Sequence, residues 1–330
     1  MRKSRKILIT GSQGYIGSSL NKVLLNKYNL INLDKFISPL ELKQKNFFKI
    51  NILNYNKLNS LFKKFKIDLI IHLAGESTID NISKKRNYIN NNVKATENLI
   101  KLMKKFKVKN LIFSSSAAVY GKKNRIIKES SPKIPNNIYG KTKLITEKII
   151  INGSKSQNFN YIILRFFNVC SSIREKKIGE FHINETHLIP LCVNKFLNNK
   201  TLKIYGKNFK TNDGTSVRDY IHIKDICTAV EQCIQYLFRK NQSQIFNLGT
   251  GKGFSNLEIA NSFKFKNKFL KYIFIKKRKG DVGKLLCSYD KIKKIIGWKP
   301  RYSKLKKIIR DEIFWQKHTL KLNKQRTFRY

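Results

Sequence analysis

The sequence predicts an α/β protein built on a doubly wound parallel sheet, with a smaller mixed lobe toward the C-terminus. Three observations support this prediction. Short apolar runs alternate with amphipathic runs through the first half of the chain, a glycine-rich turn follows the first apolar run, and polar residues end several later ones. Such alternation is typical of parallel strands buried between two layers of helices. Beyond about residue 170 the alternation fades.

The first unit has the pattern of a dinucleotide site. A buried strand at residues 6–10 leads into a glycine turn and an amphipathic run through Lys27. The glycines of the turn are spaced by three: Gly11, Gly14 and Gly17. Glycines permit a tight turn and let the backbone approach a pyrophosphate at the helix N-terminus. The next strand, residues 30–33, ends at Asp34, where a carboxylate can accept both hydroxyls of an adenosine ribose and repel a 2′-phosphate.

The later units extend the same sheet. We expect further strands at residues 46–50, 69–73, 109–113, 161–165 and 244–248, and helices at 57–65, 88–106, 143–150 and 221–238. The last strand is expected to return to the main sheet. We therefore predict a dinucleotide-binding domain over residues 1–170, with returning segments near 221–250, and an interleaved substrate-binding lobe over residues 171–330.

A tyrosine and a lysine four residues apart form a candidate acid/base pair. Tyr139 and Lys143 fall on one face of the expected helix, because four residues make about one helical turn. Lowering a tyrosine pKa from about 10 to about 7 requires about 4 kcal/mol of preference for the phenolate. One close cation and a second positive charge from a bound cofactor could supply it. A serine run, residues 114–116, ends the strand upstream at the same edge of the sheet.

Composition narrows the class of protein. The chain has 330 residues, 41% of them hydrophobic, which is ample for a buried core. No apolar stretch approaches the roughly 18 residues of a membrane span, and the basic start is not followed by a signal sequence. The five cysteines show no Cys-x-x-Cys spacing. Neither disulfides nor a zinc site is indicated, no metal is expected, and a reducing cytoplasm is the expected location.

The formal charge of +49 invites a nucleic-acid interpretation. Its lysines, however, are scattered along the whole chain among asparagine, isoleucine and phenylalanine, and arginine is comparatively scarce. Lysine, asparagine, isoleucine and phenylalanine share A/T-rich codons, so we attribute most of the charge to genome composition. We expect weak, salt-sensitive binding to RNA or acidic lipid, but neither a specific nucleic-acid partner nor a membrane partner.

Several motifs together resemble the extended short-chain dehydrogenase/reductase family, and within it the 4-epimerases of UDP-sugars. They are, in order, the glycine motif, Ser114–Gly121, the Tyr139/Lys143 pair, Leu164–Asn168 and Val217–His222. The resemblance runs from about residue 6 to about residue 316. It implies bound NAD, interconversion of UDP-glucose and UDP-galactose through a 4-ketosugar in galactose metabolism, and a homodimer held by a four-helix bundle of residues 88–106 and 139–155.

The resemblance also implies roles for individual residues. The catalytic residues would be Ser116, on the 4-hydroxyl of the sugar; Tyr139, the acid/base; and Lys143, which holds the nicotinamide ribose and lowers the tyrosine pKa. The expected cofactor contacts are Gly11, Gly14, Tyr15, Ile16, Gly17, Asp34, Asn51, Ile52, Leu73, Ala74, Gly75, Asn91, Ser114, Tyr139, Lys143 and Phe167. The expected substrate contacts are Ser116, Tyr139, Asn168, His187, Leu188, Arg218, Arg278 and Asp281. Asn51 stands where the family usually has an aspartate, and its amide oxygen can still accept a bond from adenine.

Three alternatives compete with this interpretation. A 4,6-dehydratase or a decarboxylase of the family would need acidic residues beside Ser116, where Ala117 and Ala118 stand. A 4-epimerase of another UDP-sugar, an N-acetylhexosamine, pentose or uronate, is the serious rival. Leu285, which matches a residue bordering the sugar pocket, is of intermediate bulk and favours UDP-glucose and UDP-galactose over N-acetyl sugars. From another class, a non-catalytic polyanion-binding scaffold would explain the charge.

Overall fold

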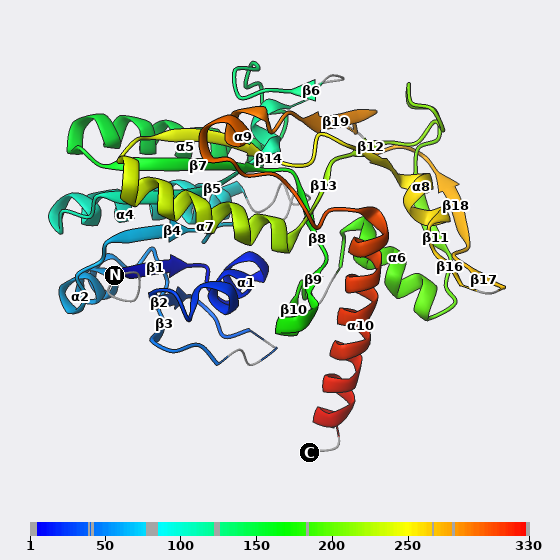
Figure 1. Cartoon of the computed structure of the whole chain (residues 1–330), viewed down its shortest axis with the longest axis horizontal. Coiled ribbons are helices and arrows are strands. Elements are labelled where there is room, and N and C mark those ends of the chain that lie inside the picture. The colour runs from blue at the N-terminus through cyan, green and yellow to red at the C-terminus, as the bar shows by residue number, and fades with distance from the viewer. Residues whose placement is uncertain are drawn as a thin grey trace.

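The structure, a computed structural model, describes residues 5–38, 40, 43–76, 85–121, 126–182, 185–265, 267–278 and 281–327. A large sheet with helices on both faces makes up one side of the molecule (Figure 1). Shorter strands and three helices make up the other side, where the long C-terminal helix runs away from the sheet (Figure 1).

The main sheet has seven strands in the order β14-β7-β5-β4-β1-β2-β3, and every neighbouring pair is parallel. The strands are β1 (Lys6–Thr10), β2 (Asn29–Asp34), β3 (Phe47–Lys49), β4 (Leu69–His72), β5 (Asn110–Ser116), β7 (Asn160–Phe166) and β14 (Gln244–Leu248). The strand order turns back between β1 and β4, which pair from Ile7↔Leu69 to Thr10↔His72. Ligands of doubly wound sheets bind at such a reversal, outside the carboxyl ends of the strands.

Each face of the sheet is covered by helices because successive strand residues point to opposite sides. In β1, Ile7 and Ile9 join the core beneath one helix layer, whereas Leu8 joins the core beneath the other. The first layer contains α1 (Tyr15–Leu24), α7 (Ile223–Lys240) and α9 (Asp290–Ile296). The second contains α2 (Tyr55–Lys64), α4 (Ala95–Lys105) and α5 (Ile138–Gln157). This architecture confirms the predicted doubly wound parallel sheet.

The helix expected over residues 88–106 differs from the prediction, because it is interrupted by a π-helical segment. It consists of α3 (Lys85–Tyr88), the π-helix η3 (Ile89–Lys94) and α4. Inside η3, the backbone oxygen of Asn92 accepts hydrogen bonds from the hydroxyls of Thr96 (2.7 Å) and Thr146 (3.2 Å). Two side-chain donors thus reach one carbonyl of the widened turn. π-Helical segments of this kind are frequent at functional sites.

The second part of the molecule has its own core between α6 (Leu188–Leu197), α8 (Asn256–Asn261) and α10 (Leu305–Thr327). A four-stranded sheet in the order β15-β12-β19-β6 contains β15 (Phe254–Ser255), β12 (Val217–Arg218), β19 (Lys284–Cys287) and β6 (Ile126–Ile127). Two-stranded sheets pair β11 (Leu202–Tyr205) with β18 (Tyr272–Ile275), β8 (Asn168–Cys170) with β13 (Tyr220–His222), β9 (Ser172–Ile173) with β10 (Ile178–Gly179), and β16 (Lys264–Phe265) with β17 (Lys268–Phe269). Two 3₁₀ turns are η4 (Ala117–Tyr120) and η5 (Arg174–Lys176).

The chain crosses between the two parts more than once. After β8 it enters the second part, and it returns through α7 and β14, which pairs with β7 from Gln244↔Ile162 to Leu248↔Phe166. The boundary near residue 170 stays a prediction. All five cysteines are buried and free. Within the described ranges, none of the helices combines the length and the apolar character that a bilayer crossing requires.

Candidate active site

The carboxyl edge of the main sheet gathers the residues that the sequence predicted around a cofactor. Six of its strands end beside one or more of them. Gly11 follows β1, Asp34 ends β2, Asn51 and Ile52 follow β3, Leu73–Gly75 follow β4, Ser114 and Ser116 end β5, and Phe167 follows β7. Because parallel strands end at a common edge, residues far apart in sequence meet there.

The glycine turn and Asp34 form one continuous surface. Gly11 has φ +72°, and a Cβ there would lie 2.7 Å from the backbone nitrogen of Ala74, so only glycine fits between the loops after β1 and β4. The backbone N–H of Gln13, within the turn, donates to Asp34 Oδ2 at 2.9 Å. Burial raises the pKa of Asp34, although the N–H groups of Gln13 and Lys35 oppose this by stabilising the carboxylate.

This surface fits the pyrophosphate and ribose of a dinucleotide. Helix α1 begins after Gly14 with neither a side-chain cap nor an acidic residue in its first turn. Its first N–H groups therefore remain available to an anion, and the helix dipole favours negative charge there. Gly11 leaves the space that a side chain would fill, and Asp34 offers its carboxylate beside the turn.

The other predicted cofactor residues differ in how they are placed. Ile52 and Phe167 are buried, whereas Ile16 and Asn91 are half-buried. The hydroxyl of Tyr15 donates to the backbone oxygen of Ser171 at 2.5 Å. Tyr15 thus links the start of α1 to the segment after β8. Asn51 is exposed, and its amide oxygen accepts the backbone N–H of Leu53 at 3.0 Å.

The candidate catalytic side chains meet at the start of α5. The side chain of Asn137 caps this helix by accepting the N–H of Gly140 at 2.7 Å. One turn on, Lys143 Nζ lies 5.9 Å from the ring centroid of Tyr139 and donates to the backbone oxygen of Ser114 at 2.8 Å. Ser116 hydrogen-bonds Tyr139. The structure therefore brings all three predicted catalytic residues together.

Burial opposes charge on both members of the pair. It raises the pKa of Tyr139 above its usual value, and the hydrogen bond from Ser116 only partly offsets this effect. Burial likewise lowers the pKa of Lys143 to about 8, against the attraction of Glu147. The predicted fall of the tyrosine pKa to about 7 is therefore not achieved by Lys143 alone. The reason is that a half-buried phenolate loses more hydration than one nearby ammonium restores.

Sequence reasoning missed Asn92, which holds the loop after β4 against α5. Its Oδ1 accepts the N–H of Glu76 at 2.7 Å, and its Nδ2 donates to Thr142 Oγ1 at 3.0 Å. A Cβ on Gly75 would lie 2.7 Å from Asn92 Oδ1 and 3.6 Å from Lys143 Nζ. The sequence shows only a run of three asparagines, residues 90–92, of which the prediction named Asn91.

A second missed group is a buried ion pair beneath the serines. Arg165, in β7, contacts Glu147, in α5, through two bonds: Nε to Oε1 at 2.9 Å and Nη2 to Oε2 at 2.7 Å. Both side chains are 2% exposed. Glu147 Oε1 also accepts the hydroxyl of Ser115 at 2.5 Å, and Arg165 Nη1 donates to Tyr120 at 2.7 Å. The pair therefore joins α5 to β5 and β7 where the catalytic side chains lie.

Two arginines and an aspartate gather at the edge of the second part of the molecule. Arg218 is half-buried in β12 and donates to the backbone oxygens of Val217 and Val282. Arg278 Nε lies 3.3 Å from Asp281 Oδ2, and its guanidinium lies 4.7 Å from the Tyr205 ring centroid. Burial and, to a smaller extent, the charge of Arg278 lower the pKa of Arg218. Two guanidiniums that repel each other form a suitable site for a diphosphate.

The remaining predicted substrate residues fall into two places. Asn168, in β8, hydrogen-bonds Tyr220 through its side chain and donates its N–H to Asp219 at 3.0 Å, next to Arg218. His187 and Leu188 begin α6. The His187 ring lies at 2.8 Å from Glu180 Oε1 and beside His182, so it belongs to a separate group of side chains.

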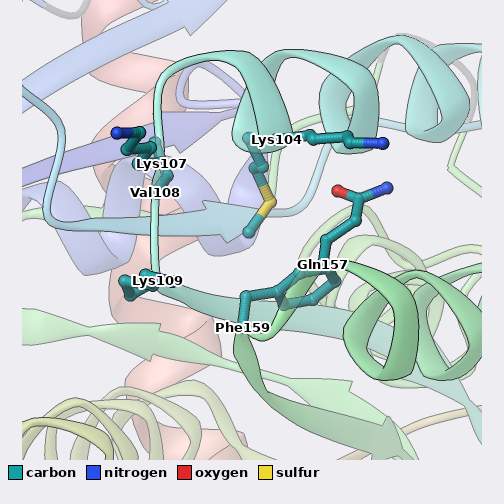
Figure 2. A pocket seen from close by; sticks show the side chains of 7 residues that line it. Lys104, Lys107, Val108, Lys109, Gln157 and Phe159 are labelled. Atoms are coloured by element: carbon teal, nitrogen blue, oxygen red, sulfur yellow. The ribbon is translucent and has the colours of Figure 1, made fainter.

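A small pocket at the opposite edge of the sheet is not part of this site. Figure 2 shows it between the end of α4, the end of α5 and the starts of β5 and β7. Its lining residues are Met103, Lys104, Lys107, Val108, Lys109, Gln157 and Phe159. None of them was predicted to bind cofactor or substrate, and strands β5 and β7 begin rather than end here.

Comparison with known proteins bears on the function of this site. A model of the NAD dependent epimerase/dehydratase family matches residues 7–249. The UDP-glucose 4-epimerase of Lacticaseibacillus casei is 36% identical over 320 residues, which cover 94% of this chain and 96% of that relative.

Solved structures show the same likeness. The UDP-glucose-4-epimerase from Stenotrophomonas maltophila, with bound NAD and formylated UDP-arabinopyranose, superposes with a TM-score of 0.91 at 26% identity and covers 96% of this chain and 99% of that one. The UDP-glucose 4-epimerase from Bifidobacterium longum, in complex with NAD+ and UDP, has a TM-score of 0.88 at 30% identity, with 96% and 99% covered.

Proposed function

The chain belongs to the NAD dependent epimerase/dehydratase family, and on that premise we propose that it interconverts UDP-glucose and UDP-galactose by inverting C4 of the sugar. The observation that carries this proposal is the meeting of Ser116, Tyr139 and Lys143 at the sheet edge that also holds the glycine turn. The enzyme is an isomerase.

The cofactor is NAD, held by the surface that the glycine turn and Asp34 form together. The carboxylate of Asp34 suits the ribose hydroxyls and would repel a 2′-phosphate. Lys143, which already donates to the Ser114 carbonyl, has further N–H donors for the second ribose. When bound there, NAD would supply a reversible hydride acceptor for C4 of the sugar, so no net oxidation or reduction of the substrate is needed.

The acid/base work falls to Tyr139. As phenolate it takes the proton of the 4-hydroxyl when the C4–H bond breaks, and it gives that proton back when C4 is reduced again. Ser116 orients the hydroxyl from the other side, since its side chain already contacts Tyr139. The 4-ketosugar must turn over between the two steps so that hydride returns to its opposite face. No proton and no electron is gained or lost overall.

The uridine diphosphate is held by the second part of the molecule. Arg218 and Arg278 bind its phosphate oxygens, and Asn168, Leu188 and Asp281 surround them; His187 is a weaker candidate because carboxylates already engage its ring. Anchoring through the diphosphate leaves the sugar free to turn, which the return of hydride to the other face requires. Binding energy from a remote group is thereby used to position the reacting carbon.

A 4-epimerase of another UDP-sugar is the rival function. The formylated UDP-arabinopyranose bound to the Stenotrophomonas maltophila structure favours it, because that pocket accepts a sugar other than glucose. Against it stands Leu285, which is half-buried and packs with the core around Ala117 and Phe167. It pairs with Arg218 in the strand register, so it lies beside the arginine proposed to hold the diphosphate, where its bulk would limit the room for an N-acetyl group on the sugar.

We also infer a cytoplasmic homodimer, formed through α4, α5 and the π-helix η3 that precedes α4. Ile89 in η3 and Ile145 in α5 are 38% and 45% exposed, although both belong to the helices expected in a four-helix bundle. Large apolar side chains exposed on adjacent helices support such an interface. Five buried, unpaired cysteines suit a reducing compartment.

The experiment that tests the proposed function is an epimerase assay run both with and without added cofactor. The purified chain is incubated with UDP-galactose, with and without added NAD, and UDP-glucose is followed with a coupled dehydrogenase. We expect turnover, and a fall in kcat of about 10²–10⁴-fold for Tyr139→Phe because a general acid/base is removed. Turnover without added NAD would show that the cofactor is tightly held. Tyr161→Phe is the matched control. Tyr161 lies at the start of β7, away from the carboxyl edge of the sheet, so this variant should keep its activity.

Three outcomes would overturn the proposal. If Tyr139→Phe kept the wild-type kcat, the phenol would not be the acid/base. If UDP-N-acetylglucosamine turned over with a kcat/KM comparable to that of UDP-glucose, the substrate preference would be wrong. A chain that turned over no UDP-sugar even with NAD would support the scaffold function. Salt-titrated RNA binding tighter than about micromolar at physiological salt would then be the finding to seek.

A further inference from the structure

A group of four possible metal ligands lies between β10 and α6, outside the catalytic residues. Glu180, His182, Glu185 and His187 each offer one ligand atom, and these atoms all lie within 4.8 Å of one another. Glutamate and histidine alternate in this group, and all four ligands come from residues 180–187. The two histidine rings stand 5.5 Å apart, centroid to centroid.

Three of the four contacts between these side chains have the separations of a metal-binding shell, and the fourth is a hydrogen bond. His187 Nδ1 lies 2.8 Å from Glu180 Oε1 and 3.6 Å from Glu185 Oε1, while His182 Nδ1 lies 3.6 Å from Glu180 Oε1 and 3.5 Å from Glu185 Oε2. Ligand atoms around a tetrahedral zinc ion at about 2.0–2.2 Å lie about 3.3–3.6 Å apart. The group therefore needs only small side-chain adjustments to surround one ion.

A buried oxygen without a hydrogen-bond partner provides a second, independent observation. The Glu180 side chain is 3% exposed, yet its Oε2 has no hydrogen-bond partner among the described residues. Glu312 Oε2, on α10, is also buried without such a partner, and Glu312 interacts electrostatically with Glu180, Glu185 and His187. A buried carboxylate is costly to leave unsatisfied, and a cation bound by Glu180 would compensate the negative charge of this group.

We propose that Glu180, His182, Glu185 and His187 bind one divalent transition-metal ion of the zinc class. Two imidazoles and two carboxylates suit zinc, whereas calcium and magnesium prefer oxygen ligands alone. The site is structural. It lies in the second part of the molecule and shares none of the three catalytic residues, and it takes His187 from the residues expected to contact substrate.

The ion would fix the start of α6 to the C-terminal helix. The backbone oxygen of Glu180 accepts the indole N–H of Trp315, in α10, at 2.5 Å, and α6 and α10 are further joined by Gln316 Nε2 donating to Pro190 at 2.8 Å. His187 immediately precedes α6. A metal on these ligands would therefore tie the loop, α6 and α10 into one unit.

The test uses the full-length chain without a histidine tag. The protein is stripped with a chelator, given zinc sulfate, desalted and analysed by mass spectrometry of its metal content. We expect about one zinc per chain, and a large loss of zinc in His182→Ala, because it removes one of four ligands. Zinc should raise the Tm of the wild type but not that of the variant. His318→Ala, whose ring contacts Phe314 and Trp315 outside the group, is the matched control and should keep its zinc.

Glu185→Gln provides a second variant of nearly the same shape if His182→Ala fails to fold. Loss of zinc with an unchanged circular dichroism spectrum would support the site. The proposal is overturned if the wild type retains no zinc. The four side chains are then held together only by hydrogen bonds and ion pairs between protonated histidines and carboxylates. It is also overturned if His182→Ala and Glu185→Gln retain as much zinc as the wild type. X-ray absorption that showed sulfur at about 2.3 Å would overturn it too, because zinc would then lie on cysteine.

Discussion

At the scale of single residues, the candidate site places two groups whose charged forms are disfavoured by burial next to each other. Burial raises the pKa of Tyr139 and lowers that of Lys143 to about 8. Burying an ammonium costs folding free energy, and the backbone oxygen of Ser114 accepts a hydrogen bond from Lys143 Nζ at 2.8 Å. The charge of Lys143 therefore does not stabilise the fold.

We predict that Lys143→Met abolishes epimerisation yet leaves the protein at least as stable. The lysine pKa is about 8 in the folded protein against 10.5 in the unfolded chain, so below pH 8 its charge costs up to about 3 kcal/mol. The unfolded chain binds more protons between these values, so wild-type stability rises with pH from about 8 to 10.5. The variant should lack this rise. Urea unfolding at pH 7 and pH 9.5 measures the stability and its pH dependence, and the coupled dehydrogenase assay measures epimerisation.

Lys141→Met is the matched control for that experiment, since Lys141 is exposed on the same helix. It should leave activity and the pH dependence of unfolding unchanged. A Lys143→Met protein that was less stable than wild type at pH 7 would show that the bond to Ser114 outweighs the buried charge. The Tyr139/Lys143 pair was predictable from sequence because helix geometry sets its spacing. Asn92 was not, because its partners Glu76 and Thr142 come from other segments.

At the scale of elements, the Glu147–Arg165 pair fixes α5 against the sheet. Tyr139, Lys143 and Glu147 share one helix, and Glu147 reaches both Ser115 in β5 and Arg165 in β7. The contacts hold the end of β5 and the start of α5 at a set distance. A bidentate ion pair whose side chains are 2% exposed permits little change in geometry. It can therefore position α5 against the sheet without contacting substrate.

We predict that Glu147→Gln destabilises the protein by about 3–5 kcal/mol and lowers kcat, because Arg165 is left buried without its counter-ion. Glu147→Met combined with Arg165→Met should cost less stability than either single change, since no buried charge then remains. Urea unfolding gives both values. Glu175→Gln, which removes the ion pair with the partly exposed Lys224, serves as the surface control and should cost less than about 1 kcal/mol. Equal losses for Glu147→Gln and Glu175→Gln would refute this role.

The elements themselves were predictable to different degrees. Residues 69–71 and 162–164 are apolar at every position, a pattern that indicates a buried parallel strand before any contact is known. The interruption of the helix over residues 88–106 by η3 was not predictable. One of its contacts is the hydroxyl of Thr146, which α5 brings to the Asn92 carbonyl, and no local preference encodes that contact. The pairing of Glu147 with Arg165 was missed for the same reason.

At the scale of the whole molecule, the net charge of +49 is opposite in sign to the UDP-sugar that we propose as substrate. A UDP-sugar carries its negative charge on the diphosphate, and Arg218 and Arg278 lie where that group is proposed to bind. A strongly positive protein raises the local concentration of such a substrate and its rate of association. This effect follows from the charge whatever its evolutionary origin, so the charge has a consequence for catalysis even without a nucleic-acid partner.

We therefore predict that kcat/KM for UDP-galactose falls about 3–10-fold as ionic strength rises from about 0.02 to 0.5 M, because the Debye length shrinks from roughly 20 Å to below 5 Å, while kcat changes little. Two variants separate local from global causes. Arg278→Gln removes one charge at the proposed diphosphate site, whereas changing Lys49, Lys63 and Lys64 to glutamate reverses three exposed charges at and beside α2. A salt dependence that flattens only in Arg278→Gln would assign the effect to the arginine pair. Flattening in the triple variant would assign it to the field of the whole molecule, and a salt-independent kcat/KM in the wild type would exclude both.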